Sequence, residues 1–449
     1  MKRKLITLSA MTLAGTFALG QTQASAVETF WHGQFRINSY FQNASKDSTF
    51  GPGDDVQASR LRFRPTLDFK FDSGVKAHIQ LNIGHINSNI TNARTDNAGN
   101  PAVGLRHGYI SAPIPNYTDW TLTAGIVPMS DKFGDTLFSG DWDYNPLVYM
   151  LTGKVADIDI RAAHGNLSEG SEQQITSNAV DDLDQWFFDA DTKMGLGASF
   201  YALNDNRKSG PAYLGTPTQN TQDYIGVRYT GKAQTIDYNA FAVYNWGKRQ
   251  VAASGSNPTE RKNSGFAVKA EAKVPVGTAK IGVLGVYASG DKDFQDATKD
   301  KSSSFITPMS VVGTTGYWGY TGKLNVQGPT DTGIDTHFVN IDGGGANSSN
   351  NLGAGIATLQ ANMSFPIMPK LDGYLAAGLF THAAKPTATA DKKYIGTDLY
   401  AQVKYMLWDN LNLEAGIDYA ALGKGHPSTI STGESKNVTL LFSRLQLEF

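Results

Sequence analysis

The feature that most constrains the fold is the stretch from Arg60 to Phe71, in which apolar and polar residues alternate. Successive side chains of a β-strand point to opposite faces, so one face would carry Leu61, Phe63, Pro65, Leu67, Phe69 and Phe71. The other face would carry Arg60, Arg62, Arg64, Thr66, Asp68 and Lys70. One face favours hydrocarbon and the other favours water, which is the arrangement of a transmembrane β-strand with an aqueous lumen. Pro65 cannot donate to a ladder, so we expect a local bulge there.

The N-terminal segment has the features of a secretory signal peptide. It begins with Lys2, Arg3 and Lys4, continues with an apolar run from Leu5 to Leu19, and ends in small residues at 24–26. The run is shorter than the roughly 20 residues that a membrane-spanning helix needs. We therefore predict that residues 1–26 are a signal peptide and that residues 27–449 form a single barrel domain.

The composition favours an exported, β-rich chain. The 39 basic residues, three of them in the leader, do not exceed the 41 acidic ones, so charge gives no reason to expect nucleic acid as a partner. The absence of cysteine excludes disulfides, thiolate metal sites and covalent haem attachment on this chain. Glycine, tyrosine and phenylalanine are all abundant, at 47, 19 and 22 residues.

Short and long connections between the expected strands alternate along the chain. A tight turn occurs at Asp72 to Gly74 and another at Asp409 to Asn410, whereas residues 289–352 form a very long connection. This is the up-and-down pattern of an outer-membrane barrel with short periplasmic turns. Both termini then lie on the short-turn side and the strand number is even. The sequence predicts an all-β, antiparallel transmembrane barrel of 18 strands, or 16 if Leu147 to Leu151 or Gln185 to Phe188 is loop.

Aromatic residues lie near both ends of the expected strands, as in the interfacial girdles of membrane barrels. Those beside the short turns are Phe71, Trp120, Tyr229, Phe365 and Trp408. Those at the opposite ends are Tyr201, Trp246, Tyr287 and Tyr419.

The chain ends in an alternating segment, Asn437 to Phe449. With the signal peptide, this ending resembles the outer-membrane β-barrels of Gram-negative bacteria, and the general porins among them. The resemblance implies an outer-membrane location with periplasmic termini, contact with outer-membrane lipid, and recognition of Phe449 by the assembly machinery. Tyr394 to Asp398 followed by Leu411 to Gly416 is similar to the closing hairpin of alginate-export-like barrels and related porins. Whether the barrel is a monomer or a homotrimer is left open.

The sequence predicts no enzyme, cofactor or metal site. The eight histidines are dispersed and none has the His-Glu-x-x-His spacing of a zinc enzyme. No partner of His78, His107 or His164 can be identified from spacing. The glycine-rich pieces do not lie between a strand and a helix, so they form no phosphate cradle.

The inward face of the first strands is expected to be strongly basic. The pore-lining candidates are Arg36, Arg60, Arg62, Arg64, Asp68, Lys70 and Lys76. Over the last three strands, acidic residues outnumber basic ones on this face, so the wall is polarised. Two interpretations stay open, because the arginines could meet solutes or could be paired structurally with carboxylates.

The third long connection, Met129 to Pro146, is the candidate for a constriction. It contains Phe133, Phe138, Trp142 and Tyr144, which are apolar anchors unusual for a solvent-exposed loop. By analogy with general porins we expect it to fold into the lumen, where Phe133, Asp135, Asp141 and Asp143 are the constriction candidates. The 289–352 connection is the alternative.

A barrel of this size leaves an aqueous channel unless a segment plugs it. The sequence therefore predicts a porin for passive diffusion of small hydrophilic solutes or ions, with a weak anion preference at low salt. One alternative is a barrel sleeve that encloses a partner such as a multihaem cytochrome. The other, a polysaccharide export channel, is implied only by the family similarity.

Overall fold

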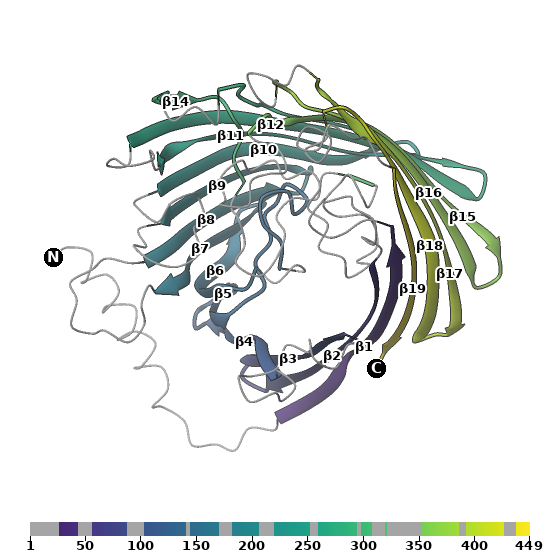
Figure 1. Ribbon diagram of the computed structural model, residues 1–449. Helices are drawn as coiled ribbons and strands as arrows, with labels where there is room; N and C mark the ends of the chain where they lie inside the picture. Colours follow the sequence, from purple (N-terminus) through teal and green to yellow (C-terminus); the bar gives the residue numbers. More distant parts are fainter. Residues whose placement is uncertain are drawn as a thin grey trace.

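The strands form one closed antiparallel barrel (Figure 1). The computed structural model describes residues 27–43, 56–87, 103–140, 144–169, 182–205, 220–251, 259–293, 298–307, 319–320, 353–385, 392–425 and 437–449. Within these ranges, 18 long strands follow one another around the ring, and β1 pairs with β19 to close it. The short β14 lies outside this series and pairs in parallel with β12. In the same ranges, no helix is long and apolar enough to cross a membrane.

The strand bounds are β1 Val27–Gln42, β2 Val56–Phe71, β3 Lys76–Asn87, β4 Val103–Ile114, β5 Tyr117–Ile126, β6 Leu147–Val155, β7 Ile158–Glu169, β8 Asp182–Thr192, β9 Leu196–Asp205, β10 Asn220–Ala233, β11 Ile236–Val251, β12 Thr259–Val276, β13 Ala279–Ala288, β14 Lys301–Ser302, β15 Ile356–Met368, β16 Leu371–Thr381, β17 Tyr394–Trp408, β18 Leu411–Leu422 and β19 Val438–Glu448. The prediction of an 18-strand barrel is confirmed. The two segments that could have been loop, Leu147 to Leu151 and Gln185 to Phe188, belong to strands β6 and β8.

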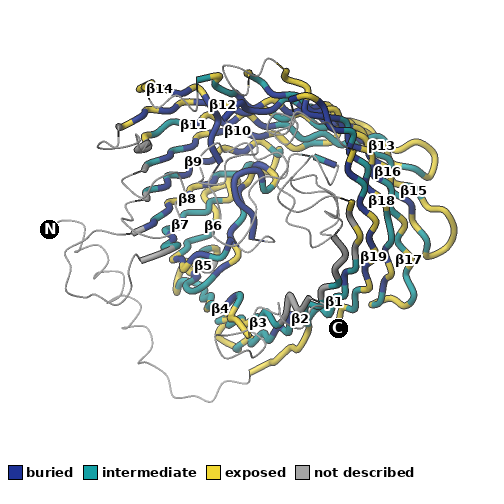
Figure 2. Tube along the Cα trace, viewed as in Figure 1, coloured by how far each residue is buried: buried dark blue, intermediate teal, exposed yellow. Residues whose placement is uncertain are grey.

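Each strand has an apolar outer face and a largely polar inner face, as the alternation predicts. On β4, Ile110 is exposed on the outside, whereas on β8 Gln185 and Asp189 are buried on the inside. Figure 2 shows this alternation as a change of burial from one residue to the next along many strands. The exposed apolar residues form a continuous surface for lipid, because they lie on every second position of neighbouring strands.

The aromatic girdles are only partly as expected. Tyr229, Tyr287 and Trp408 are exposed on the outside. Tyr201 does not belong to a girdle, because it is fully buried on the inner face of β9 among the rings of an inserted loop. The prediction was wrong here because Tyr201 lies next to Phe200, and it is Phe200 that faces outward.

Pro65 is accommodated without the expected bulge. The register of β1 with β2 is constant through the pair Gly33 and Pro65, and the register of β2 with β3 is the same on both sides of Pro65. The register shift lies instead between Leu61 and Arg62. Gly33 provides the space, since a Cβ there would come within 2.6 Å of the Arg64 carbonyl oxygen and 3.1 Å of the Pro65 Cα.

Candidate functional site

The described part of the loop between β5 and β6, residues 127–140 and 144–146, lies inside the barrel. Its residues Met129, Phe133, Leu137, Phe138 and Tyr144 are almost completely buried. In Figure 2 the described part of this segment runs as a dark, buried tube within the ring of strands. A connection that extended into solvent would leave these side chains exposed, so the loop packs against the barrel wall.

Aromatic contacts fix one side of the β5–β6 loop to the wall. The Phe138 ring lies 5.3 Å from Phe187 on β8 and 5.1 Å from Tyr201 on β9, between ring centroids. The Phe133 ring lies 5.4 Å from Phe241 on β11. Gly226 on β10 leaves room for it, because a Cβ at this position would come within 2.6 Å of the Phe133 ring.

The Asp131 carboxylate organises the β5–β6 loop from within. It accepts hydrogen bonds from the backbone N–H groups of Phe133 at 2.6 Å, Leu137 at 2.5 Å and Phe138 at 2.9 Å. Burial raises the pKa of this carboxyl to about 7, the three N–H groups oppose the increase, and the negative charge of Asp135 adds to it. Asp131 therefore shapes the loop and contributes no charge at its surface.

Arginines from two distant strands hold the backbone of the β5–β6 loop. Arg161 on β7 donates to the Ser130 carbonyl oxygen at 2.9 Å and pairs with Asp189 at 2.6 Å. Arg106 on β4 donates to the Gly140 carbonyl oxygen at 2.9 Å. Together with the contacts to β8, β9, β10 and β11, these bonds show that the loop lies along the inner wall between β4 and β11.

A second segment, from the connection between β13 and β15, also packs inside the barrel. Tyr224 on β10 donates to the Ile306 carbonyl oxygen at 2.9 Å, and the Phe305 ring is buried beside it. Further along, the Tyr320 hydroxyl donates to Glu271 on β12. The alternative loop identified from sequence thus also enters the lumen with its described residues.

The basic candidates on β1 and β2 lie on the inner face, and the structure gives them amide partners. Arg36 donates to Gln446 at 2.8 Å, Arg62 donates to Gln34 at 2.7 Å, and Arg64 donates to Asn82 at 3.0 Å. An amide oxygen accepts a hydrogen bond without cancelling the charge of a guanidinium group. On β19, Arg444 pairs with Glu414 at 3.2 Å.

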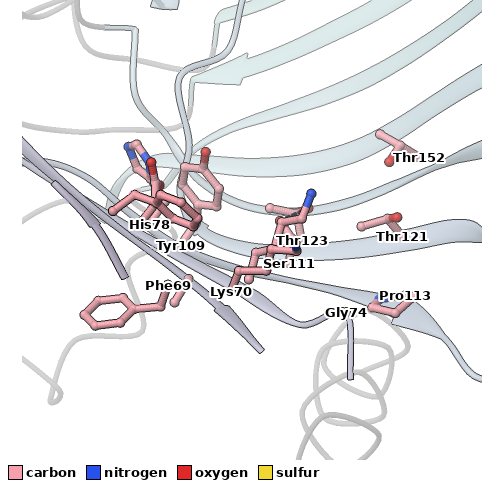
Figure 3. Close-up of a pocket in the computed structure, with 14 residues that line it drawn as sticks. Phe69, Lys70, Gly74, His78, Tyr109, Ser111, Pro113, Thr121, Thr123 and Thr152 are labelled. Atoms are coloured by element: carbon pink, nitrogen blue, oxygen red, sulfur yellow. Dashed lines mark hydrogen bonds and ion pairs between the residues drawn. The ribbon is translucent and has the colours of Figure 1, made fainter. Parts of the chain in front are cut away.

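Three of the remaining candidates, Asp68, Lys70 and Lys76, lie close to the short turn between β2 and β3. They line the periplasmic cavity, a space of about 610 Å³ that Ser111 on β4 also lines (Figure 3). Asp68 accepts hydrogen bonds from His32 and His78, both at 2.6 Å. Lys70 pairs with Glu28 at 3.2 Å and stands directly opposite Lys76 in the β2–β3 register. The side chain of Arg60, and the whole of Asp141 to Asp143, lie outside the part of the chain that the structure describes. Asp135 adopts a positive φ of 58° in the loop.

The analysis of the sequence missed the network that carries the β5–β6 loop. The Tyr201 hydroxyl donates to Asp189 at 2.6 Å and accepts the Lys132 N–H at 3.1 Å, while Arg228 pairs with Asp191. The wall residues of this network come from four neighbouring strands, β7 to β10. The strand register brings them together, as in the pair of Arg161 on β7 with Asp189 on β8. The one available signal was their position on inward-facing sites of adjacent strands.

A closed barrel with an apolar outer surface and a polar, loop-filled interior defines an outer-membrane β-barrel protein. No family model matches the chain, and no curated protein matches it either. Solved structures do match over most of its length.

Three of these solved structures are proteins of Pseudomonas aeruginosa. OccK9 (OpdG) has a TM-score of 0.56 at 11% identity, covering 94% of this chain and 99% of that one. OccK10 (OpdN) has a TM-score of 0.54 at 10% identity, covering 93% and 99%. OpdK with vanillate has a TM-score of 0.50 at 10% identity, covering 93% and 99%. At such identity the likeness establishes a shared barrel fold.

Proposed function

We propose that the protein is a porin that lets small hydrophilic solutes or ions diffuse passively across the outer membrane, with a weak anion preference at low salt. The observation that carries this proposal is the β5–β6 loop, whose described part packs along the inner wall from β4 to β11 and occupies part of the lumen. Barrels of 16 to 18 strands leave an aqueous channel when no plug domain fills them. One of the structural neighbours is a complex with vanillate, a small anion, which supports the same kind of cargo.

The anion preference rests on the inner face of β1 and β2. Arg62 and Arg64 lie two residues apart on β2, so their side chains leave the strand on the same face, at backbone positions about 6.6 Å apart. Arginine stays ionised at every accessible pH, and such fixed charge enriches anions until salt screens it. Near 1 M salt the Debye length falls to about 3 Å and the preference should fade.

The rival function is a sleeve around a partner such as a multihaem cytochrome. A sleeve needs a free interior, whereas here the β5–β6 loop occupies the interior and is fixed by Arg106 and Arg161. An interior that already holds a fixed loop favours a solute channel over a sleeve around a partner.

The test is the conductance and zero-current potential of the purified protein in planar bilayers under a salt gradient. We expect stable channels, and a potential that moves toward cation preference when Arg60, Arg62 and Arg64 are all changed to Ala. A control triple with the same loss of charge at the periplasmic turns, Lys193, Lys232 and Lys280 to Ala, should move it less. A haem protein that co-purifies in equal amount with a non-conducting barrel would favour the sleeve instead.

A further inference from the structure

Three lysines form a row on the outer surface of the barrel, at the end away from the short turns. Lys248 on β11 stands directly opposite Lys262 on β12, and Lys262 stands opposite Lys301 on β14. Figure 1 shows β14 beside the end of β12. Directly opposed residues project on the same face, and neighbouring strands lie about 4.8 Å apart. Arg261 and Asn263, on either side of Lys262, are buried on the inner face, so the lysines face outward.

The lysine row is electrostatically unfavourable by itself, because like charges directly opposite each other destabilise a sheet. Lys248 pairs with Glu260 at 3.2 Å. Lys262 and Lys301 are exposed and form no ion pair with any residue in the described part of the chain. Asp300 bonds to the Lys262 N–H through its backbone carbonyl oxygen. An anion between the two ammonium groups would offset their repulsion.

Aromatic rings lie on the same outer face, nearer to the middle of the strands. Trp246 lies two residues from Lys248 along β11. Phe266 lies four residues from Lys262 along β12, and its ring centroid is 5.6 Å from that of Tyr287 on β13. Such rings mark the level at which lipid headgroups meet hydrocarbon. The lysines therefore stand at the height of the headgroups of the outer leaflet.

An apolar groove of about 640 Å³ continues from Tyr287 along the outer face of β12, β13, β15 and β16. Val268, Leu359 and Leu379 line it with exposed side chains. Gly285 also lines it, and a Cβ on this glycine would meet no atom within 4 Å. The groove lies on the hydrocarbon side of the aromatic rings, so its shape and apolar lining fit an acyl chain.

We propose that this face of the barrel binds one molecule of the phosphorylated glycolipid that forms the outer leaflet of outer membranes. A phosphate group sits between Lys262 and Lys301, whose ammonium groups act on it as point charges. One acyl chain lies in the groove over Gly285. Lys262 and Val268 are about 20 Å apart along β12, a span that a disaccharide headgroup and its acyl chain can bridge. The site lies outside the lumen and does not depend on what passes through the barrel.

The test is native mass spectrometry of the detergent-solubilised protein, titrated with diphosphoryl lipid A in EDTA. EDTA removes divalent cations, which would otherwise bridge phosphate to carboxylates near the row. Each lysine near a lipid surface contributes about a factor of five, so changing both Lys262 and Lys301 to Gln should raise the Kd about 25-fold. Changing Lys193 and Lys232 to Gln removes the same charge at the periplasmic turns and should leave the Kd unchanged.

The groove is tested separately with a variant that fills it. Gly285→Leu places an apolar side chain in the groove and keeps the surface compatible with lipid, so it should raise the Kd about three- to tenfold. Ala198→Leu adds a side chain of the same kind to the exposed outer face of β9, away from the groove, and is the matched control. An unchanged Kd in Gly285→Leu would overturn the assignment of the groove to an acyl chain.

Lipid A from which both phosphates have been removed identifies the phosphate contact. It should bind the wild-type protein and the variant lacking Lys262 and Lys301 with the same affinity, because the lysines then have no charge to meet. Equal affinity of the two lysine-pair variants for diphosphoryl lipid A would overturn the proposal. Displacement of lipid A by an excess of inorganic phosphate would also overturn it, since the row would then be a site for a free anion.

Discussion

Arg106 on β4 donates a hydrogen bond of 2.9 Å to the backbone carbonyl oxygen of Gly140, near the end of the β5–β6 loop. The other guanidinium nitrogen of Arg106 donates to Gln80 on β3 at 2.7 Å. One charged side chain therefore joins the barrel wall to a loop that packs inside the barrel. Because a charged donor makes stronger bonds than a neutral one, this link should help to keep the loop inside.

Phe138→Ala should release the β5–β6 loop from the wall and give larger, noisier single-channel currents. The Phe138 ring is fully buried and contacts three other rings, and truncation of such a residue costs about 3–5 kcal/mol. Deleting residues 134–141 should give a still larger conductance. The control is Phe188→Ala, which removes a ring that is exposed on the outer face of β8. Wild-type conductance in both loop variants would show that the segment around Phe305 limits the current instead.

The packed loop should be more stable at acidic than at alkaline pH. The pKa of Asp131 is raised to about 7 by burial, above its usual value of 3.8, so the packed state binds a proton more tightly than the released state. Its stability therefore increases as the pH falls below 7 and decreases as the pH rises through 7. We expect more frequent excursions to high conductance at pH 8.5 than at pH 5.5. Asp131→Asn should remove this dependence, and more excursions at the acidic pH would contradict the assignment.

Two neighbouring residues of β4 should respond in opposite ways to the same substitution. Ile110 is exposed on the outer face, whereas Ser111 lines the periplasmic cavity. An arginine in the hydrocarbon region of a barrel costs about 2–4 kcal/mol near the bilayer midplane. Ile110→Arg should therefore reduce the folded fraction in lipid vesicles, measured by the heat-dependent shift on gel electrophoresis. Ser111→Arg should fold normally, and equal folding of both variants would mean that the faces of β4 are assigned incorrectly.

Two turn glycines should differ in their tolerance of alanine. Gly195 and Gly277 both have a positive φ, of 82° and 60°. For either residue the left-handed conformation alone costs alanine about 1–2 kcal/mol. A Cβ on Gly195 would also lie 1.8 Å from the Thr230 carbonyl oxygen, whereas one on Gly277 would have no atom within 4 Å. Gly195→Ala should thus lower the midpoint of urea unfolding in lipid clearly more than Gly277→Ala, and equal midpoints would contradict the packing described for β9 and β10.

The faces of the strands could be predicted because the signal is local. Alternation with a period of two assigns each side chain to the lipid or the lumen without any knowledge of its neighbours, since the bilayer offers the same hydrocarbon all around the barrel. On β2 this assigns Arg62 and Arg64 to the lumen face. The short turns fixed the order of the strands, which in an up-and-down barrel determines which strands pair.

The interior could not be predicted in the same way, because there the environment of a residue depends on which distant segment packs against it. Tyr201 has the sequence context of a girdle residue, yet it lies beneath Phe138 of a loop that precedes it by a long stretch of chain. Asp131 has the sequence context of a polar loop residue, yet the loop closes around its carboxylate. The sequence by itself determined the barrel, an even number of strands and the two faces of its wall. Only the tertiary structure decided which loop residues meet the wall and which charges remain in the lumen, because these contacts join strands that neither a periodic pattern nor a turn brings together.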